Sequence, residues 1–214
     1  MSATPSNAPL ESRPIPKCQR RFPCDASSVP LVWVTGNSGA GKSTVCALLK
    51  SMGELAVDAD WEGYNKWVDR ASGQVVVDPP DPVPAGWLDR FAWKISRAEV
   101  EALVARLHDK TAFLCGCVEN EADVWDLFDL VVCVVVDNET VRHRLLTRAT
   151  NSFGKHPEEL AAALEHNDGV ESTYRRLGAT IIDGRQPPTE VADAILAAAG
   201  RLPSTSSVGE RGAL

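Results

Sequence analysis

The sequence lacks the features that are typical of membrane proteins, of cysteine- or histidine-rich metal sites and of nucleic-acid-binding proteins. No apolar run reaches the roughly 20 residues that a membrane-spanning helix needs, and the N-terminal region lacks the apolar segment of a secretion signal. The 6 cysteines and 4 histidines follow no spacing typical of metal ligands. A formal net charge of −7 argues against nucleic acid or an anionic membrane as a broad partner. We therefore expect a cytoplasmic protein with no membrane or nucleic-acid partner.

The length and composition favour a single domain with a hydrophobic core. The 214 residues are 44% hydrophobic and 24% charged, which is ordinary for a globular protein. Residues 1–29 contain five prolines and no hydrophobic periodicity, so they are predicted to form a disordered arm. Residues 203–214 are rich in serine and glycine and are predicted to form a flexible tail. The predicted domain spans residues 30–202.

The most informative stretch lies between an apolar run and a helix-compatible run, and it reads Gly36, Asn37, Ser38, Gly39, Ala40, Gly41, Lys42, Ser43, Thr44. Glycines allow backbone N–H groups to curve around an anion without a clash from Cβ. A helix that begins at Gly41-Lys42 directs the positive end of its dipole at the same anion. The charge of Lys42 suits the β- and γ-phosphates of a nucleotide, and the Ser43 hydroxyl suits Mg²⁺.

With this motif between a strand and a helix, the sequence resembles the P-loop nucleotide-binding proteins, and among them the small kinases of the adenylate kinase, shikimate kinase and gluconate kinase group. The resemblance implies an α/β fold with a doubly wound parallel five-stranded sheet and helices on both faces. It also implies ATP and Mg²⁺ as cofactors. A GTPase or a transporter ATPase fits less well, because the sequence contains neither an N-K-x-D nor an L-S-G-G-Q motif.

Apolar runs that alternate with helical periodicity predict the same architecture. The predicted strands are residues 31–35, 55–58, 111–115, 130–136 and 179–183. The predicted helices are residues 42–52, one that starts after Ser96, 121–127, one that Asp137 caps, 157–166, 168–177 and 190–199. Proline-rich residues 78–86 are predicted to form a stiff loop. Ligands of such sheets bind at the carboxyl ends of the strands, so the site is expected there.

The second predicted strand ends in Asp58-Ala59-Asp60. Because the two aspartates alternate along an extended segment, they cannot have the same role. The resemblance to shikimate kinase implies that Asp58 acts near the acceptor through Mg²⁺ or its water, and that Asp60 accepts a hydrogen bond from the acceptor hydroxyl. The alternative is that both are acidic turn residues. The third strand ends in Gly116 rather than in the aspartate of adenylate kinase-like chains, and we expect the backbone to approach the acceptor closely there.

Two arginines, Arg144 and Arg148, lie one helical turn apart. Each is expected to reach over the ATP phosphates from a lid at about residues 142–156, or else to belong to a solvated basic face. By the resemblance, adenine lies near Arg148 and near the loop after the fifth strand. The candidates in that loop are Asp183, Arg185 and Pro187.

Residues 61–97 are predicted to bind the acceptor, because four of the six tryptophans lie in this segment. Tyr64, Trp67 and Trp93 are candidates to line the site, since flat rings suit a nucleobase or a sugar. Alternatively, the aromatic residues Trp61, Tyr64 and Trp67 form one face of a helix that packs on the core. Arg97 is a further candidate for substrate binding.

The predicted activity is transfer of a phosphoryl group from ATP to a hydroxyl of a small molecule, such as a nucleoside, a sugar or a hydroxy acid. The expected catalytic residues are Lys42, Asp60, Arg144 and Arg148. One alternative is a nucleoside monophosphate kinase, which needs cations for the phosphate of its acceptor and has Arg70, Arg90, Lys94 and Arg97 available. The other is a non-catalytic ATP-binding regulator. The protein is expected to act on a small molecule as a monomer or a homodimer.

Overall fold

A computed structural model of the protein describes residues 30–107 and 110–202, so the predicted arm at 1–29 and tail at 203–214 lie outside the described residues. Five parallel strands form the main sheet in the order β2-β5-β1-β6-β7. Their bounds are β1 Leu31–Thr35, β2 Leu55–Asp58, β5 Ala112–Cys115, β6 Leu130–Val135 and β7 Thr180–Asp183. All five agree with the predicted strands to within one residue at each end.

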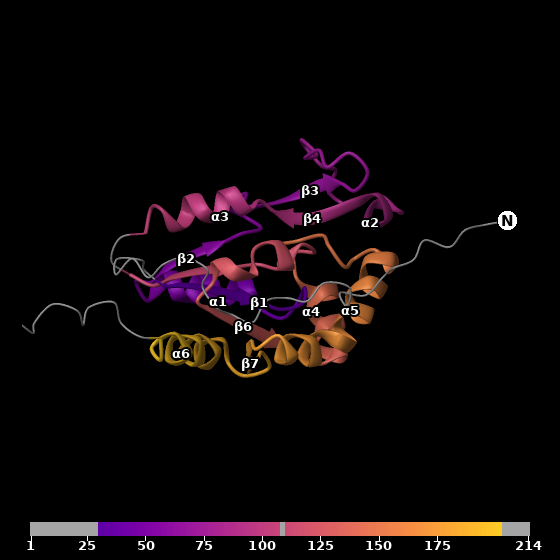
Figure 1. The fold of residues 1–214 in the computed structure, drawn as a ribbon. Coiled ribbons are helices and arrows are strands. Elements are labelled where there is room, and N and C mark those ends of the chain that lie inside the picture. Colours follow the sequence, from indigo (N-terminus) through magenta and orange to yellow (C-terminus); the bar gives the residue numbers. More distant parts are fainter. Residues whose placement is uncertain (1–29, 108–109, 203–214) are drawn as a thin grey trace, which may run out of the picture.

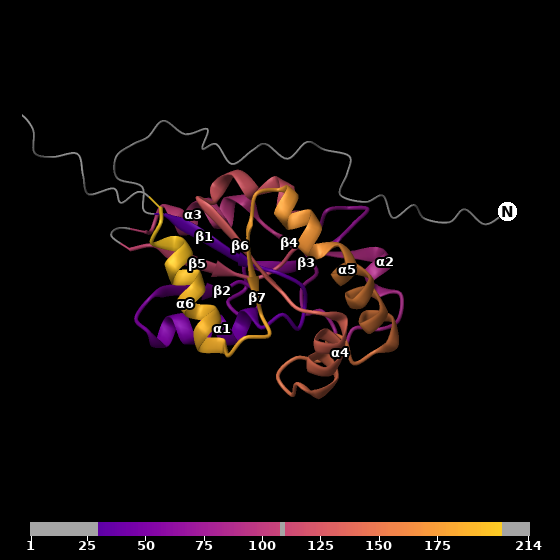
Figure 2. The same ribbon diagram turned by 90° about the horizontal axis from the view of Figure 1, so that it is seen from below.

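Helices cover both faces of this sheet. On one face, α1 (Lys42–Ser51) and α6 (Pro188–Ala199) lie side by side (Figure 2). The other face carries α3 (Arg97–Val104), α5 (Pro157–Arg176) and two 3₁₀ turns, η2 (Glu121–Asp123) and η3 (Trp125–Leu127). A further helix, α4 (Asn138–Thr147), packs beside α5. The predicted doubly wound α/β fold is therefore confirmed.

The alternation of side chains along β1 explains the two-sided packing. Every residue of β1 is buried, and successive side chains of a strand point to opposite faces. Val32 and Val34 pack with the apolar sides of α1 and α6, whereas Leu31 and Trp33 pack on the other face. A fully buried central strand of this kind reads as a continuous apolar run, which is why the sequence predicted it well.

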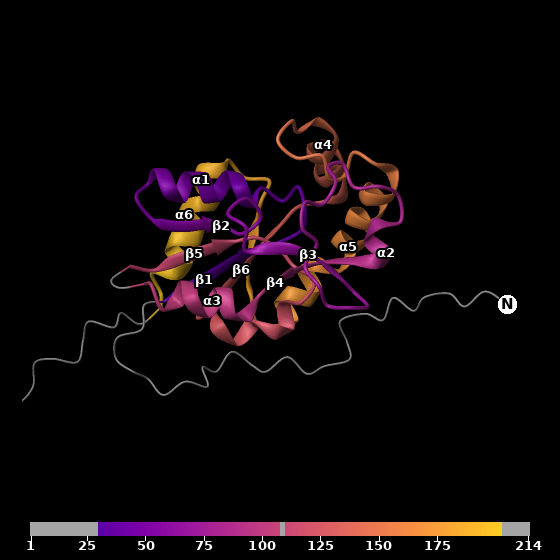
Figure 3. The same cartoon turned by 90° about the horizontal axis from the view of Figure 1, so that it is seen from above.

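Residues 61–95 contain regular structure that the sequence analysis did not predict. Two strands, β3 (Asn65–Asp69) and β4 (Phe91–Ile95), form an antiparallel pair, and the short helix α2 (Trp87–Arg90) precedes β4. This pair of strands is called the hairpin below, although residues 70–90 connect β3 to β4. It forms a second sheet that is separate from the main sheet (Figure 1). The loop before α2 lies near the start of α5, where the amide of Gly86 donates to Glu158 at 3.1 Å (Figure 3). The alternative of one helical face for the aromatic residues at 61, 64 and 67 is wrong, because Trp61 and Tyr64 lie in a turn and Trp67 lies on β3.

Two predicted helix boundaries also need correction. Residues 157–166 and 168–177 form one helix, α5, because Gly169 stays helical. A glycine costs a helix only about 1 kcal/mol, and burial of Val170 and Tyr174 offsets that cost. The last helix, α6, begins at Pro188 rather than at 190, since proline is favoured in the first helical turn. The predicted cap is confirmed for α4, where Asp137 accepts from the amide of Thr140 at 2.7 Å.

The carboxyl ends of the five strands share one edge, as predicted. Asp58 lies beside Cys115 in the register of β2 and β5, and Val135 lies beside Asp183 in that of β6 and β7. The glycine-rich loop leaves β1 at the same edge, between these two pairs. The fold therefore gathers the predicted site residues of separate strands at one edge of the sheet.

Candidate functional site

The glycine-rich loop 36–44 has the backbone shape of an anion cradle. Gly36 has φ +136°, and a Cβ at this position would overlap the carbonyl oxygen of Val134, so only glycine fits. The amides of Gly39, Gly41, Lys42 and Ser43 find no hydrogen-bond acceptor within residues 30–107 and 110–202. These N–H groups at the start of α1 are the donors that an anion would satisfy.

Lys42 lies inside this loop and is only 7% exposed. Its ammonium donates to the carbonyl oxygens of Gly36 at 2.7 Å and Asn37 at 3.0 Å. A buried ammonium needs such partners when no stronger anion is nearby. The same position allows it to turn toward a phosphate in the loop, so the residues present fit a nucleotide.

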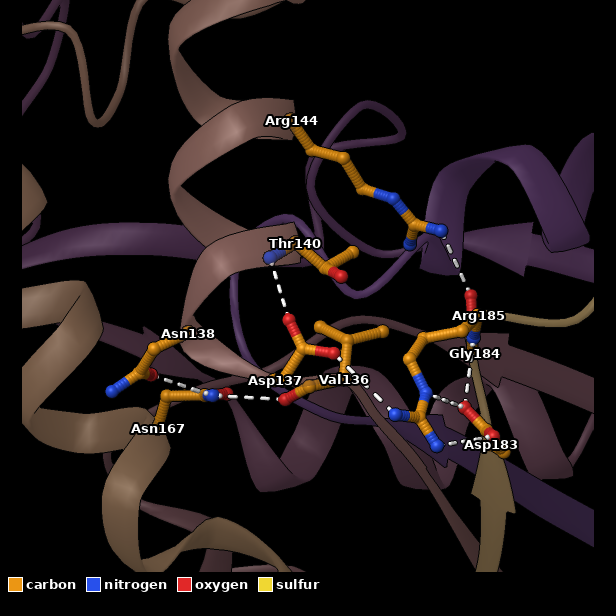
Figure 4. A network of polar contacts seen from close by, with 9 residues as sticks. All are labelled: Val136, Asp137, Asn138, Thr140, Arg144, Asn167, Asp183, Gly184 and Arg185. Carbon is orange, nitrogen blue, oxygen red and sulfur yellow. Dashed lines mark hydrogen bonds and ion pairs between the residues drawn. The ribbon is translucent and has the colours of Figure 1, made fainter.

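Arg144 contacts backbone carbonyl groups of the glycine-rich loop. Its guanidinium donates to the carbonyl oxygens of Gly39 at 3.2 Å and Ala40 at 3.0 Å. It also donates to the carbonyl oxygen of Gly184 at 2.9 Å (Figure 4). These bonds tie the glycine-rich loop to the loop that follows β7. In this structure Arg144 is therefore a positioning residue for the loop, and the prediction that it reaches over the phosphates from a lid differs from the contacts found.

A row of asparagines holds the other side of the loop. Asn37 donates to the carbonyl of Ala163 at 2.8 Å and to the side chain of Asn167 at 3.1 Å. Asn167 in turn donates at 2.9 Å to the carbonyl of Val136 and to Asn138 (Figure 4). The second residue of the motif thus connects the loop to α5 and to the start of α4.

The two aspartates have different partners because β2 ends at Asp58 and the chain turns there, instead of staying extended to Asp60 as the sequence analysis assumed. Asp58 is buried, and its Oδ1 accepts from the amides of Asp60 at 3.2 Å and Trp61 at 3.3 Å. Asp60 instead faces the hairpin, where its Oδ1 accepts from Trp93 Nε1 at 3.0 Å and Asn65 Nδ2 at 2.6 Å. Within the described part of the chain, Oδ2 of Asp60 accepts no hydrogen bond. One carboxylate oxygen is anchored and the other is available to a ligand.

The directions of two pKa shifts indicate that Lys42, Asp60 and Arg148 lie in the same region of the molecule. Burial raises the pKa of the Cys117 thiol, while the charge of Lys42 lowers this pKa and that of Asp60 raises it. Burial lowers the pKa of Arg148, and the charge of Asp60 is the largest opposing effect. Cys117 therefore lies near both Lys42 and Asp60, and Arg148 lies near Asp60.

The guanidinium of Arg148 has an unsatisfied donor. Its NH2 group donates to the carbonyl of Phe153 at 2.8 Å, but its Nε is buried with no hydrogen-bond partner among the described residues. A buried unpaired donor is costly, so this atom is a candidate to pair with an anionic ligand. Sequence reasoning placed Arg148 near the site, and the burial of the residue and its neighbours support this placement.

Three of the predicted substrate-binding residues have other partners. Arg97 forms a two-point pair with Asp126, at 2.7 and 2.8 Å, and the hydroxyl of Tyr64 accepts from Arg106 at 3.0 Å. A Cβ on Gly116 would lie 2.9 Å from Cβ of Ala59, so this glycine allows close packing of the protein itself. Close packing therefore explains the glycine, and an approach of its backbone to the acceptor stays a prediction.

The predicted adenine-side residues lie on the loop after β7. Arg185 pairs with both carboxylate oxygens of Asp183, at 2.9 and 2.8 Å, and this pairing lowers the pKa of Asp183 to about 2 (Figure 4). Pro187 immediately precedes α6 as its cap residue. Gly184 is buried against Val134 and against the carbonyl of Ala40. This contact brings the loop next to the glycine-rich loop, as expected for one nucleotide site.

Glu121 is a buried carboxyl group that the sequence analysis missed. It is 6% exposed, accepts a hydrogen bond from the Tyr174 hydroxyl, and lies 3.5 Å from the hydroxyl of Thr35, the residue before the glycine-rich loop. Burial raises the pKa of Glu121 to about 7, although the nearby charge of Lys42 acts in the opposite direction. No local motif marks this residue, since its partners come from β1 and α5.

Replacing Glu121 with glutamine should remove a pH dependence of stability. Because its pKa rises from the usual 4.5 to about 7 on folding, the folded protein binds this proton more tightly. Its contribution to stability is therefore full below pH 4.5 and is lost as the pH rises through 7. From pH 4.5 to 8 we expect wild type to lose about 2 to 3 kcal/mol of unfolding free energy relative to Glu121→Gln.

Urea unfolding of both proteins at pH 5 and pH 8 measures this difference. Glu139→Gln, an exposed substitution of the same type on α4, is the control and should keep the same offset from wild type at both pH values. A constant offset between wild type and Glu121→Gln would contradict a raised pKa for Glu121.

The predicted Mg²⁺ ligands form no complete metal site by themselves. Ser43 is exposed at the start of α1, and Asp58 is buried at the end of β2. Across the described residues, no group of three His, Cys, Asp or Glu side chains is arranged to hold a metal ion. Two protein ligands with additional oxygens from phosphates and water are the ordinary arrangement for Mg²⁺ in phosphoryl-transfer sites.

Among residues 30–107 and 110–202, no helix is long and apolar enough to cross a membrane.

Two open hollows of about 570 Å³ lie elsewhere on the molecule. One is at the end of the hairpin, around Asp69 and Arg90, and the other lies between Asp137, Asp168 and Arg185. Neither is lined by any residue of 36–44. The second hollow is lined by Asp183 and Arg185, which are predicted adenine-side residues, whereas the first is lined by none of the predicted catalytic or cofactor-binding residues.

Comparison with known proteins agrees with this geometry. Residues 32–165 match a family model described as an AAA domain. Among solved structures, the chain is similar to shikimate kinase from Acinetobacter baumannii in complex with shikimate, with 20% identity, a TM-score of 0.51, and coverage of 83% of this chain and 97% of that chain. It is also similar to TT1252 from Thermus thermophilus, with 21% identity, a TM-score of 0.52, and coverage of 83% and 100%. No curated protein matches the sequence.

Proposed function

The chain belongs to the AAA-domain family and has the fold of P-loop small-molecule kinases, and from this premise we propose that it is an ATP-dependent phosphotransferase acting on a hydroxyl of a small molecule. The observation that supports this most is the convergence of three groups at one edge of the sheet. They are the cradle of free amides around Lys42, the carboxylate of Asp60 and the guanidinium of Arg148. Phosphoryl transfer needs positioning and charge neutralisation more than covalent chemistry, and these groups supply both.

Each group has a role in this proposal. The loop amides and Lys42 hold the triphosphate, and Arg148 neutralises charge on the transferred phosphoryl group through donors that the protein leaves unpaired. Oδ2 of Asp60 accepts a hydrogen bond from the acceptor hydroxyl and orients its oxygen toward the γ-phosphorus. A bond forms from that oxygen to phosphorus, the bond from phosphorus to the bridging oxygen of ADP breaks, and the hydroxyl proton passes to Asp60.

Ser43 and Asp58 are the residues that would hold Mg²⁺, which neutralises phosphate charge when bound. Asp183, Arg185 and Pro187 would border the adenine, because their loop packs on the glycine-rich loop through Gly184. The shikimate kinase with a similar fold acts on a small hydroxylated acid, which agrees with a small acceptor here.

An acceptor screen tests the proposal. The protein is incubated with Mg²⁺ and ATP and with a panel of nucleosides, nucleotides, sugars and hydroxy acids, and mass spectrometry identifies any phosphorylated product. ADP formed together with an equal amount of phosphorylated acceptor is expected for at least one compound class. Tight binding of ATP with no phosphorylated product from any class would instead support the non-catalytic regulator.

A further inference from the structure

We propose that the phosphate acceptor is an uncharged ring compound with a hydroxyl, of the nucleoside or sugar kind, rather than a nucleotide or a hydroxy acid. This inference rests on the proposed function and names the chemistry of its second substrate. Its basis is the chemical character of the groups around Asp60, together with the ion pairs that occupy the cations of the hairpin.

An acceptor with its own phosphate or carboxylate needs a cation to bind it, and the arginines of the acceptor segment are already paired. The pairs are Arg70 with Glu119 at 2.6 Å, Arg90 with Asp69 at 3.0 Å and Arg97 with Asp126 at 2.7 Å. Arg97 also reaches Glu101 at 2.9 Å. Breaking such a pair to bind an anionic acceptor would leave a carboxylate beside that anion, which is unfavourable.

Lys94 points away from the groups that face Asp60. Residues opposite one another in an antiparallel pair lie on the same face, and neighbours along a strand lie on opposite faces. Lys94 is opposite Lys66, whereas Trp93 is opposite Trp67. Since Trp93 donates to Asp60, the face that carries the two lysines is the far face of the hairpin.

The face of the hairpin next to Asp60 is aromatic and uncharged near that residue. The rings of Trp93 and Trp67 lie 5.1 Å apart, and Trp87 continues the row at 5.9 Å from Trp67. Indole rings of this kind stack on nucleobases and on the apolar faces of sugars. A ring compound bound along this row would have its hydroxyl near Oδ2 of Asp60.

Two polar atoms of this row lack partners among the described residues. Oδ1 of Asn65 and Nε1 of Trp87 are buried without a hydrogen bond, and Asn65 as a whole is only 3% exposed. Buried polar atoms are almost always paired in native proteins. One acceptor and one donor in this state suit a ligand with hydroxyl or amide groups, and neither atom carries a charge that would select an anion.

The remaining cations of the site are required by the triphosphate. Lys42 lies within the glycine-rich loop, and Arg148 is a cation whose pKa is lowered by burial and raised by the charge of Asp60. A triphosphate carries several negative charges, so these two cations are not in excess. A second anion placed between the triphosphate and Asp60 would meet mainly repulsion.

Matched compound pairs test this inference. Adenosine is compared with its 5′-monophosphate, and glucose with gluconate, each with Mg²⁺ and ATP, while product is measured by mass spectrometry. For at least one pair, we expect kcat/KM to be at least about 10-fold higher for the uncharged member. The pair that shows this difference tells whether the acceptor is a nucleoside or a sugar. Equal or preferred use of a charged member would overturn the inference and leave the proposed function intact.

Calorimetry of acceptor binding in the presence of a non-hydrolysable ATP analogue distinguishes a failure of this inference from a failure of the proposed function. If uncharged members bind but no compound is phosphorylated, the inferred acceptor class is supported and the proposed phosphoryl transfer is contradicted. If no compound of either pair binds or reacts, the inference is overturned.

Substitution of the aromatic row gives an independent readout. Trp67→Ala should raise KM for the uncharged acceptor about 10-fold and leave KM for ATP within about twofold, whereas Trp67→Phe should keep both near wild type. Trp61→Ala is the control, because that side chain is 64% exposed and has no ring contact in the described structure. An equal rise of both KM values in Trp67→Ala would indicate a merely structural role and contradict the inference.

Discussion

Replacing Lys42 with alanine is expected to lower kcat about 100- to 1,000-fold, the range found when one preorganised transition-state donor is removed. The side chain is buried in the glycine-rich loop, and its ammonium lies on the carbonyls of Gly36 and Asn37. When a triphosphate occupies the loop, this charge can stabilise the extra negative charge that develops on the phosphoryl oxygens in the transition state. The loss should therefore fall mainly on kcat, with a smaller rise in KM for ATP.

Steady-state kinetics with the acceptor identified by the screen measure this effect. Lys50→Ala is the matched control: it removes a lysine from the same helix, but one that is exposed and paired with Glu62 at 2.6 Å. It should change kcat less than twofold, since exposed ion pairs contribute little. Lys42→Met removes the charge but keeps most of the side-chain length, so it is a second variant in which a fall in kcat is not caused by misfolding of an emptied loop. Turnover near wild type in both Lys42 variants would rule out the proposed nucleotide site.

Local sequence signals predicted the parts of this site that depend on neighbouring residues. The turn, its glycines and the start of α1 lie within nine consecutive residues, so backbone sterics and one motif define them. The cap of α4 depends on Asp137 and Thr140 alone. The different partners of Asp58 and Asp60 do not follow from strand geometry, because residues two apart on a strand share a face. They differ because β2 ends at Asp58 and the chain turns.

The unpredicted parts depend on contacts between residues far apart in the chain. Trp93 is 33 positions from Asp60, and Tyr174 is 53 positions from Glu121. No spacing rule relates such residues, because tertiary packing decides which of several aromatic or acidic side chains meet. Arg144 illustrates the same limit: its helix was predicted, but its carbonyl partners more than 100 positions away along the chain were not.

Replacing Asp60 with asparagine is expected to lower kcat/KM about 100-fold, the lower end of the range for a general base. Asparagine keeps a carbonyl oxygen that can accept from Trp93 and Asn65, so the anchoring contacts of Oδ1 remain. The change places an NH₂ group where Oδ2 stood, which removes the acceptor for the substrate hydroxyl and for its proton. The substitution thus alters one atom of the proposed chemistry while keeping the anchored geometry.

The kinetics of Asp60→Asn also distinguish positioning from proton transfer. If Asp60 only orients the hydroxyl, KM for the acceptor should rise along with the fall in kcat; if it also takes the proton, most of the loss should appear in kcat. Asp89→Asn, an exposed change of the same type on α2, is the control and should leave both constants within about twofold. ATP binding by Asp60→Asn should match wild type, because Asp60 contacts the hairpin and not the glycine-rich loop. An Asp60→Asn enzyme as active as Asp89→Asn would exclude the Asp60 carboxylate from the reaction.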